Sequence, residues 1–288
     1  MRPHTSPRAV AFMLCVAAAA LMAGCASRPQ APILEQPVGN AAAASAVADR
    51  LDALLPADVL LLGEQHDAAE HQQIEQQVIA ILAARGLLAA VALEMADAGV
   101  STATLQPGAS EAQTRRALAW NDKAWPWQSY GPAVMTAVRA GVPVLGANLP
   151  PARMQGSMAD STLDVQLPGP ALKAQQQLIR TGHCNQLPEG KITPMTRIQI
   201  ARDLSLAETL QQAVLPGKVV VLLAGSGHVD RGLGVPQHLP ADLNAKAVHL
   251  RAGEGADNDR TQAFDAVWPT PAVPATDYCG GLKAQLTP

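Results

Sequence analysis

Residues 218–228 read KVVVLLAGSGH, in which five large aliphatic residues and an alanine precede GSGH at 225–228. A continuous apolar run of this length, preceded by Pro-Gly at 216–217, is typical of a strand that is covered on both faces of a parallel sheet. Glycines at its carboxyl end allow a sharp turn and a close approach of the backbone to another group. We therefore expect His228 to lie at the mouth of a crevice at the carboxyl edge of the sheet.

The same design occurs near the start of the folded part of the chain. Residues 58–62 (DVLLL) are an apolar run that continues into GEQH at 63–66. Since the carboxyl ends of parallel strands lie at one edge of a sheet, the two segments predict one shared site. The residues that we assign to it from these motifs are Gly63, Glu64, His66, Gly227 and His228.

Helical periodicity follows the first strand and is followed by a second apolar run. We expect a helix with Asp67 as its N-cap and an end at Gly86, and then a strand over residues 88–93 that delivers Glu94. A strand, a helix and a strand in this order form a right-handed crossover unit, so we expect residues 58–62 and 88–93 to be parallel and neighbouring.

Strand and helix patterns continue to alternate through the rest of the chain. The further elements that we expect are helices over 111–121 and 133–140, a strand over 142–147, a helix from 150, an irregular insertion over 171–190, a long helix from Thr193, and strands over 246–250 and 263–267, the last at an edge. This order predicts an α/β fold, with a mostly parallel central sheet flanked by helices and a helical insertion.

The N-terminal segment predicts export. Arg2 and Arg8 precede an apolar stretch at residues 10–22, and residues 21–25 read LMAGC, which resembles a bacterial lipobox. An ordinary secretory signal is the alternative interpretation. Ala26 occupies the position where aspartate is the usual signal for retention in the inner membrane, so we expect an outer-membrane lipoprotein that faces the periplasm.

The predicted organisation has three parts. Residues 1–24 form the signal peptide, residues 25–44 a flexible tether that starts at the lipidated Cys25, and residues 45–288 one folded domain. Loss of the two arginines in the signal peptide changes the formal net charge from −3 to −5. A mildly acidic chain without a basic cluster is a poor nucleic-acid binder, so we exclude that class of partner.

Two cysteines remain outside the N-terminal segment, Cys184 and Cys279. An exported chain favours a disulfide between them, which would hold the carboxyl-terminal tail against the loop at residues 181–188. A pair of metal-binding thiolates is the alternative.

Together with VALEM at 91–95, the GEQH and GSGH motifs resemble the ChaN haem-binding uptake family, within the wider superfamily of Tiki, TraB and erythromycin-esterase proteins. The resemblance runs from about Asp58 to the WP and YC segments near the end of the chain. It implies a lipid-anchored protein of haem or iron uptake that binds haem non-covalently, with a homodimer as one possible arrangement. It also implies that six residues take part in the site: Gly63, Glu64, His66, Glu94, Gly227 and His228.

Haem requires an axial ligand and an apolar slot. Three of the four tryptophans lie at residues 120–127, immediately before Tyr130, and this concentration of aromatic side chains favours a flat ligand, although core filling is the alternative. We take Tyr130 as the first candidate for the iron ligand. The other predicted cofactor-binding residues are Trp127, Gly63, Gly227 and Arg231, and the alternative ligands are His66, His183 and His228.

A second function is compatible with the same residues. Two imidazoles and a carboxylate, His66, His228 and Glu94, form a common donor set for zinc or another divalent metal. With Glu64 they also suit acid–base chemistry, as in a hydrolase of the Tiki or esterase type acting on a peptide or an ester. A structural ion pair of Glu94 with Arg153, Arg202 or Arg231 is the alternative to a role in the site.

Overall fold

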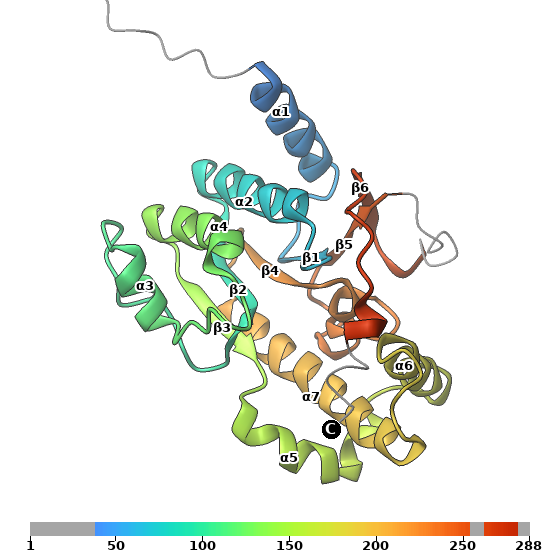
Figure 1. Cartoon of the computed structure of the whole chain (residues 1–288). Coiled ribbons are helices and arrows are strands. Elements are labelled where there is room, and N and C mark those ends of the chain that lie inside the picture. The colour runs from blue at the N-terminus through green and yellow to red at the C-terminus, as the bar shows by residue number, and fades with distance from the viewer. Residues whose placement is uncertain (1–37, 254–261, 282–288) are drawn as a thin grey trace, which may run out of the picture.

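Six strands form the centre of the fold in the computed structural model, which describes residues 38–253 and 262–281 (Figure 1). They are β1 (Val59–Glu64), β2 (Leu88–Asp97), β3 (Val144–Asn148), β4 (Val219–Gly225), β5 (Ala245–Ala252) and β6 (Ala266–Thr270). All of them pair in parallel in the order β3-β2-β4-β1-β5-β6. The predicted parallel α/β fold is confirmed, and β6 lies at an edge as expected.

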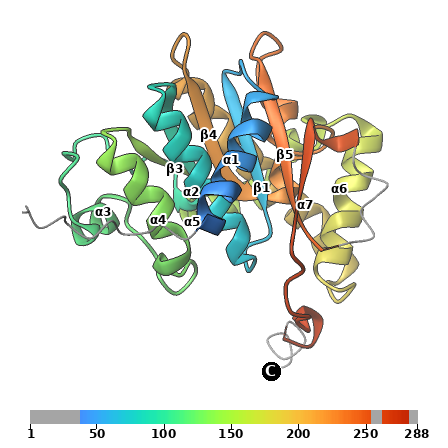
Figure 2. The ribbon, with the colours of Figure 1, turned by 90° about the horizontal axis from the view of Figure 1, so that it is seen from above.

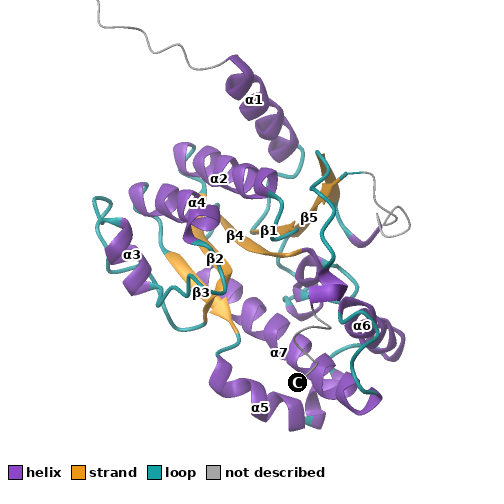
Figure 3. Ribbon diagram, in the orientation of Figure 1, coloured by secondary structure: helices purple, strands orange, loops and turns teal. Residues whose placement is uncertain are grey.

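Helices cover both faces of this sheet (Figures 1 and 2). The α-helices of the described residues are α1 (Val38–Asp52), α2 (Ala69–Ala84), α3 (Glu111–Ala117), α4 (Trp127–Arg139), α5 (Pro151–Ala159), α6 (Gly169–Gly182) and α7 (Glu189–Ala213). Short 3-10 helices are η1 (Ser161–Val165), η2 (Ser226–Val229) and η3 (Val235–His238). Figure 3 shows the strands enclosed between α2 and α4 on one side and α7 on the other.

The alternation of side chains along each strand builds two separate cores. In β1, Leu60 and Leu62 pack in the cluster that includes α2 and α4, whereas Val59 and Leu61 pack in the cluster that includes α7. Successive residues of a strand point to opposite faces, so a run that is apolar throughout fills both layers. This is why the two strands that precede the motifs show no polar alternation.

The neighbours of β1 differ from our expectation. β1 and β2 are parallel, but β4 lies between them and pairs with both. All seven residues of β4 are buried, and a central position is the one that covers such a strand on both faces and both edges. The insertion of β4 also places the ends of β1, β4 and β2 side by side.

Several element boundaries differ from the sequence pattern. α1 starts at Val38, inside the predicted tether. α2 has Ala68 as its N-cap rather than Asp67, whose carboxylate accepts hydrogen bonds from the side chain of Gln65 and from the hydroxyl of Tyr278. α7 starts at residue 189, so Pro194 lies within the helix instead of opening it.

The predicted insertion is helical and forms a subsidiary core. α5, η1 and α6 pack on the first half of α7 around Leu149, Leu163 and Ile200. Residues 169–182, which include most of the segment that we expected to be irregular, form the regular helix α6. The chain then turns at Cys184 and Asn185, both at positive φ.

The predicted disulfide is confirmed: Cys184 is bonded to Cys279. It joins the turn after α6 to the carboxyl-terminal segment, and Figure 1 shows the two lying together. The predicted signal peptide and Cys25 lie outside the described residues. Among the helices that the structure describes, none combines the length and the apolar character that crossing a bilayer requires.

Replacing Cys184 and Cys279 with serine should lower the free energy of unfolding by about 2–4 kcal/mol, because the bond closes a loop with a sequence separation of 95 residues. Urea unfolding followed by tryptophan fluorescence measures the loss. Adding a reductant to the unmodified protein should produce the same change, and adding it to the double variant should produce none. Equal stability of the oxidised protein and the double variant would contradict this prediction.

Candidate functional site

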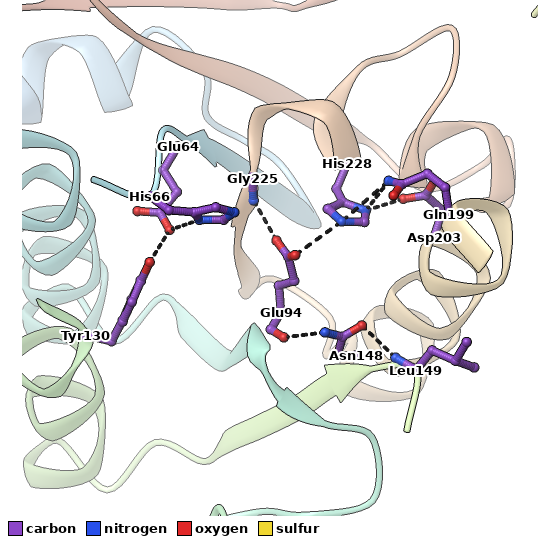
Figure 4. A network of polar contacts seen from close by, with 10 residues as sticks. All are labelled: Glu64, His66, Glu94, Tyr130, Asn148, Leu149, Gln199, Asp203, Gly225 and His228. Atoms are coloured by element: carbon purple, nitrogen blue, oxygen red, sulfur yellow. Dashed lines mark hydrogen bonds and ion pairs between the residues drawn. The ribbon is translucent and has the colours of Figure 1, made fainter. Parts of the chain in front are cut away.

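The site is built at the carboxyl ends of β1, β4 and β2 (Figure 4). The register of the sheet places Glu64 beside Gly225. His66 follows β1 by two residues, and His228 is carried by η2 directly after β4. The two imidazoles, 162 positions apart in the sequence, therefore lie at one rim, because the adjacent strands end there.

Glu64 is a buried carboxylate that accepts hydrogen bonds from three side chains. His66 Nδ1 and the hydroxyl of Tyr130 each lie 2.8 Å from Oε1, and Gln72 Nε2 lies 2.5 Å from Oε2. These donors compensate the loss of water around the carboxylate. Because Glu64 accepts the Nδ1 proton, the lone pair of a neutral His66 is at Nε2.

The His66 ring lies directly against the turn after β4. A Cβ atom at Gly225 would come within 3.0 Å of its Nε2, so only glycine leaves room for this imidazole. The edge of Trp125 packs on the other side, with the ring centres 4.9 Å apart. The His66 side chain nevertheless keeps 42% of its surface exposed.

Gly63 supports the same turn from below. A Cβ at this position would lie 2.2 Å from Val229 Cγ2, which belongs to η2. The glycine therefore lets the helix that carries His228 pack on β1. The GEQH motif thus shapes the backbone of the site as well as supplying Glu64 and His66.

Glu94 and His228 form a buried ion pair across β2 and η2. His228 Nε2 lies 3.3 Å from Glu94 Oε1, and its Nδ1 lies 2.5 Å from Asp203 Oδ1 of α7. The backbone N–H of Gly225 donates to Glu94 Oε2 at 2.8 Å. Asn148 fixes the backbone of β2 from the other side by donating from Nδ2 to the carbonyl oxygen of Glu94 at 2.9 Å.

Charge and burial shift the titration of this group strongly. Burial disfavours the charged form of His228, but the carboxylates of Glu94 and Asp203 outweigh it and raise the pKa of the imidazole to about 10. Burial likewise opposes ionisation of Glu94, yet His228 lowers the pKa of that carboxyl to about 2. For Asp203, burial is the dominant effect and raises the pKa to about 6. His228 is therefore an imidazolium at neutral pH.

The imidazole of His66 differs from that of His228 in its exposure and in the causes of its pKa shift. Burial lowers the pKa of its imidazole, but the hydrogen bond to Glu64 and the charge of Glu94 have the larger combined effect, and the pKa is raised. One ring nitrogen faces the cavity while the other is held by Glu64, which is the arrangement of an oriented acid–base or ligand imidazole.

A cavity of about 770 Å³ opens above this rim. That volume lies within the range of sites that bind cofactor-sized ligands. Of the predicted site residues, those that line it are Glu64, His66, Glu94, Gly227 and His228. The remaining predicted residues lie elsewhere.

Tyr130, Trp127 and Arg231 do not line this cavity. Tyr130 is 1% exposed and donates its hydroxyl hydrogen to Glu64. Burial and the Glu64 carboxylate raise the pKa of the phenol. The indole N–H of Trp127 donates to Glu111. Arg231 pairs with Asp265 at 2.6 Å, and the partner of Glu94 is His228 instead of any of the three arginines considered. The position of Tyr130 and Trp127 in an aromatic-rich segment of the sequence did not indicate whether their side chains line the cavity.

The predicted metal set is not arranged around a common point. Among the residues that the structure describes, no group of three or more histidine, cysteine, aspartate or glutamate side chains is placed to hold an ion. Both ring nitrogens of His228 already contact carboxylates, so neither is available to a metal. The predicted zinc ligands therefore do not form a metal centre within the described residues.

Sequence reasoning missed Gln199 and Asp203 of α7, and it considered Arg202 only as an ion-pair partner of Glu94. Gln199 and Arg202 line the cavity, and Asp203 binds His228 on the side away from Glu94. A signal was present, since Asp203 lies at helical spacing from the buried Ile200 and Ala207, and a carboxylate on an apolar helix face needs a partner. The sequence did not show that the partner would be His228.

His71 was also missed. Its Nδ1 accepts the backbone N–H of Gln65 at 2.9 Å, and its Nε2 lies 2.9 Å from Thr270 Oγ1. Burial lowers the pKa of this imidazole to about 4, so the ring is neutral, as an acceptor must be. His71 thereby holds the loop that carries His66.

Comparison with known proteins identifies a family. The family model described as "Haem-binding uptake, Tiki superfamily, ChaN" matches residues 50–239. A solved structure titled "Cofacial heme binding to ChaN of Campylobacter jejuni" is 25% identical with a TM-score of 0.61, covering 72% of this chain and 87% of the other. A protein from Bacillus cereus is 12% identical with a TM-score of 0.43, covering 74% and 70%. No curated protein matches the chain.

Replacing His228 with glutamine should lower the free energy of unfolding by about 3–5 kcal/mol near pH 6, since it leaves Glu94 buried without its counter-charge. The raised pKa means that folding favours the protonated imidazole. The stabilisation from that proton is complete below pH 6.5 and is lost as the pH rises towards 10, so the difference between wild type and variant should shrink over this range.

Urea unfolding at a series of pH values measures this difference. The matched control is the double variant Glu94→Gln/His228→Gln, which removes both charges and should recover part of the stability. A deficit in the single variant that is independent of pH between 6 and 10 would contradict an ion pair as its cause.

Proposed function

Because the chain belongs to the ChaN haem-binding uptake family of the Tiki superfamily, we propose that it binds haem non-covalently in haem or iron uptake. The observation that carries the proposal is the cavity of about 770 Å³ at the strand ends, into which the half-exposed, Glu64-oriented imidazole of His66 projects. An imidazole with one nitrogen held by a carboxylate and the other facing a cavity suits an iron porphyrin.

We further propose that the protein is anchored by a lipid on Cys25 in the outer membrane and faces the periplasm. The support is the LMAGC sequence at residues 21–25 followed by Ala26. The disulfide between Cys184 and Cys279 agrees with an oxidising compartment. Labelling with a radioactive fatty acid tests the anchor, which Cys25→Ser should abolish.

Two side chains at this rim offer a ligand atom for the iron. One is His66, through Nε2. The other is Tyr278, which is not among the residues that line the cavity but is 57% exposed and donates its hydroxyl hydrogen to Asp67, the residue after His66. Tyr130, the candidate from the sequence, is 1% exposed and donates its hydroxyl hydrogen to Glu64 (Figure 4).

Haemin titrated into the soluble part of the protein should produce a shifted Soret band. We expect His66→Ala or Tyr278→Phe to alter the band and weaken binding by about tenfold or more, which corresponds to loss of about 1.4 kcal/mol. Tyr130→Phe provides the comparison: it removes a buried hydroxyl that donates to Glu64 behind the site, so it should weaken binding less than either of these variants. A Soret shift that disappears only in Tyr130→Phe would overturn our placement of the haem, and no shift in the wild type would overturn the function.

One observation favours a second candidate function, histidine-based hydrolysis. Two imidazoles, each hydrogen-bonded to carboxylates, line one cavity. His66 could act as a general base oriented by Glu64, while the positive charge of His228, whose ring nitrogens are both held by carboxylates, would stabilise developing negative charge at longer range. The proton that leaves the attacking water would be taken up by Nε2 of His66.

A chromogenic ester of p-nitrophenol provides a test of this candidate. Any enzymatic rate should rise as the pH passes the raised pKa of His66, because the base must be unprotonated, and His66→Ala should remove it. A chelator should leave the rate unchanged. Equal hydrolysis by the wild type and His66→Ala would exclude this function while leaving haem binding untouched.

A further inference from the structure

Arg202 is a cation of the site to which no hydrogen-bond acceptor is assigned within the described part of the chain. It lies on α7 beside Asp203, and its Nε is buried without a hydrogen bond. Among the residues that the structure describes, no hydrogen bond or ion pair joins Arg202 to another side chain. Five residues earlier on α7, by contrast, Arg197 is held by Asp164 through two hydrogen bonds of 2.8 and 2.6 Å.

A guanidinium in such a position is incomplete. Arginine carries five N–H donors in a planar fork and remains charged, and burying any of them without an acceptor costs free energy. Glu94 binds His228 and the N–H of Gly225, and Asp203 Oδ1 binds His228, while Asp203 Oδ2 is buried without a hydrogen bond and accepts none from Arg202. A ligand that carries a carboxylate would supply the acceptor that Arg202 lacks among the described residues.

Arg202 also stands where two cavities meet. It lines the main cavity of about 770 Å³ and a second cavity of about 450 Å³, and His66 and Glu94 line both. The second cavity is lined by apolar side chains such as Met95, Trp125 and Met154, and also by polar ones, Asp97, Asn121 and Asn148. A cation beside an apolar surface suits a ligand that carries a carboxylate on an apolar body.

We propose that Arg202 is a carboxylate-binding residue of this site and that it pairs with a propionate of the bound porphyrin. This assignment rests on the proposed function, and it deepens it by naming the group that orients the ligand. The guanidinium fork binds a carboxylate through two parallel N–H···O bonds, so it would also fix the orientation of the bound macrocycle.

The test compares haemin with haemin dimethyl ester, in which both propionates are neutral esters. The wild type should bind haemin more tightly than the ester. Arg202→Gln should weaken haemin binding by roughly tenfold to a hundredfold, the effect of losing a charge-assisted hydrogen-bonded pair, and leave binding of the ester unchanged. Arg202→Lys, which retains the charge without the fork, should show an intermediate loss.

The matched control is Arg139→Gln, which removes an exposed arginine at the end of α4. It should bind both porphyrins as the wild type does. If Arg202→Gln keeps the wild-type preference for haemin, or weakens both ligands equally while Arg202→Lys does the same, the assignment of Arg202 is overturned and haem binding stands. If the wild type binds neither porphyrin, the proposed function fails and the assignment fails with it.

Discussion

The structure around the strand ends depends on the burial of one carboxylate. Glu94 is 4% exposed in a layer that is otherwise apolar, so it requires a counter-charge and hydrogen-bond donors in fixed places. His228 supplies the charge, and the N–H of Gly225 supplies a donor from the neighbouring strand. Because Asp203 holds His228 from α7, the same contact ties β2, β4 and a helix of the opposite layer together.

This constraint divides the two histidines between different tasks. His228 is enclosed by carboxylates and remains charged, so it serves to fix the geometry and the field of the rim. His66 is half exposed, is held only at Nδ1, and has room over Gly225 because that residue has no side chain. The pair therefore combines one rigid, charged imidazole with one that can meet a ligand, and this is the basis for both of the functions considered above.

The contacts behind the rim show why the site belongs to the whole fold. Tyr130 from α4 and Gln72 from α2 hold Glu64, and Asn148 from β3 holds the backbone at Glu94. The helices α2 and α4 cover one face of the sheet and β3 is its edge strand, so these hydrogen bonds also fix how the helices pack on the sheet. The side chains that reach the cavity are few, whereas the side chains that position them come from most of the domain.

The sequence by itself determined the strand pattern, the parallel α/β class, the disulfide and the meeting of His66, Glu94 and His228 at one edge. These follow from local physics, because a run that is apolar throughout must be buried on both faces, and the ends of parallel strands coincide. The order of the strands, the inward turn of Tyr130 and the contributions of Asp203 and Arg202 were decided by the tertiary structure. Those features depend on which surfaces of the helices and the sheet meet. Periodicity along the chain does not determine these contacts, because the partner of a buried charge can come from any element that packs against it.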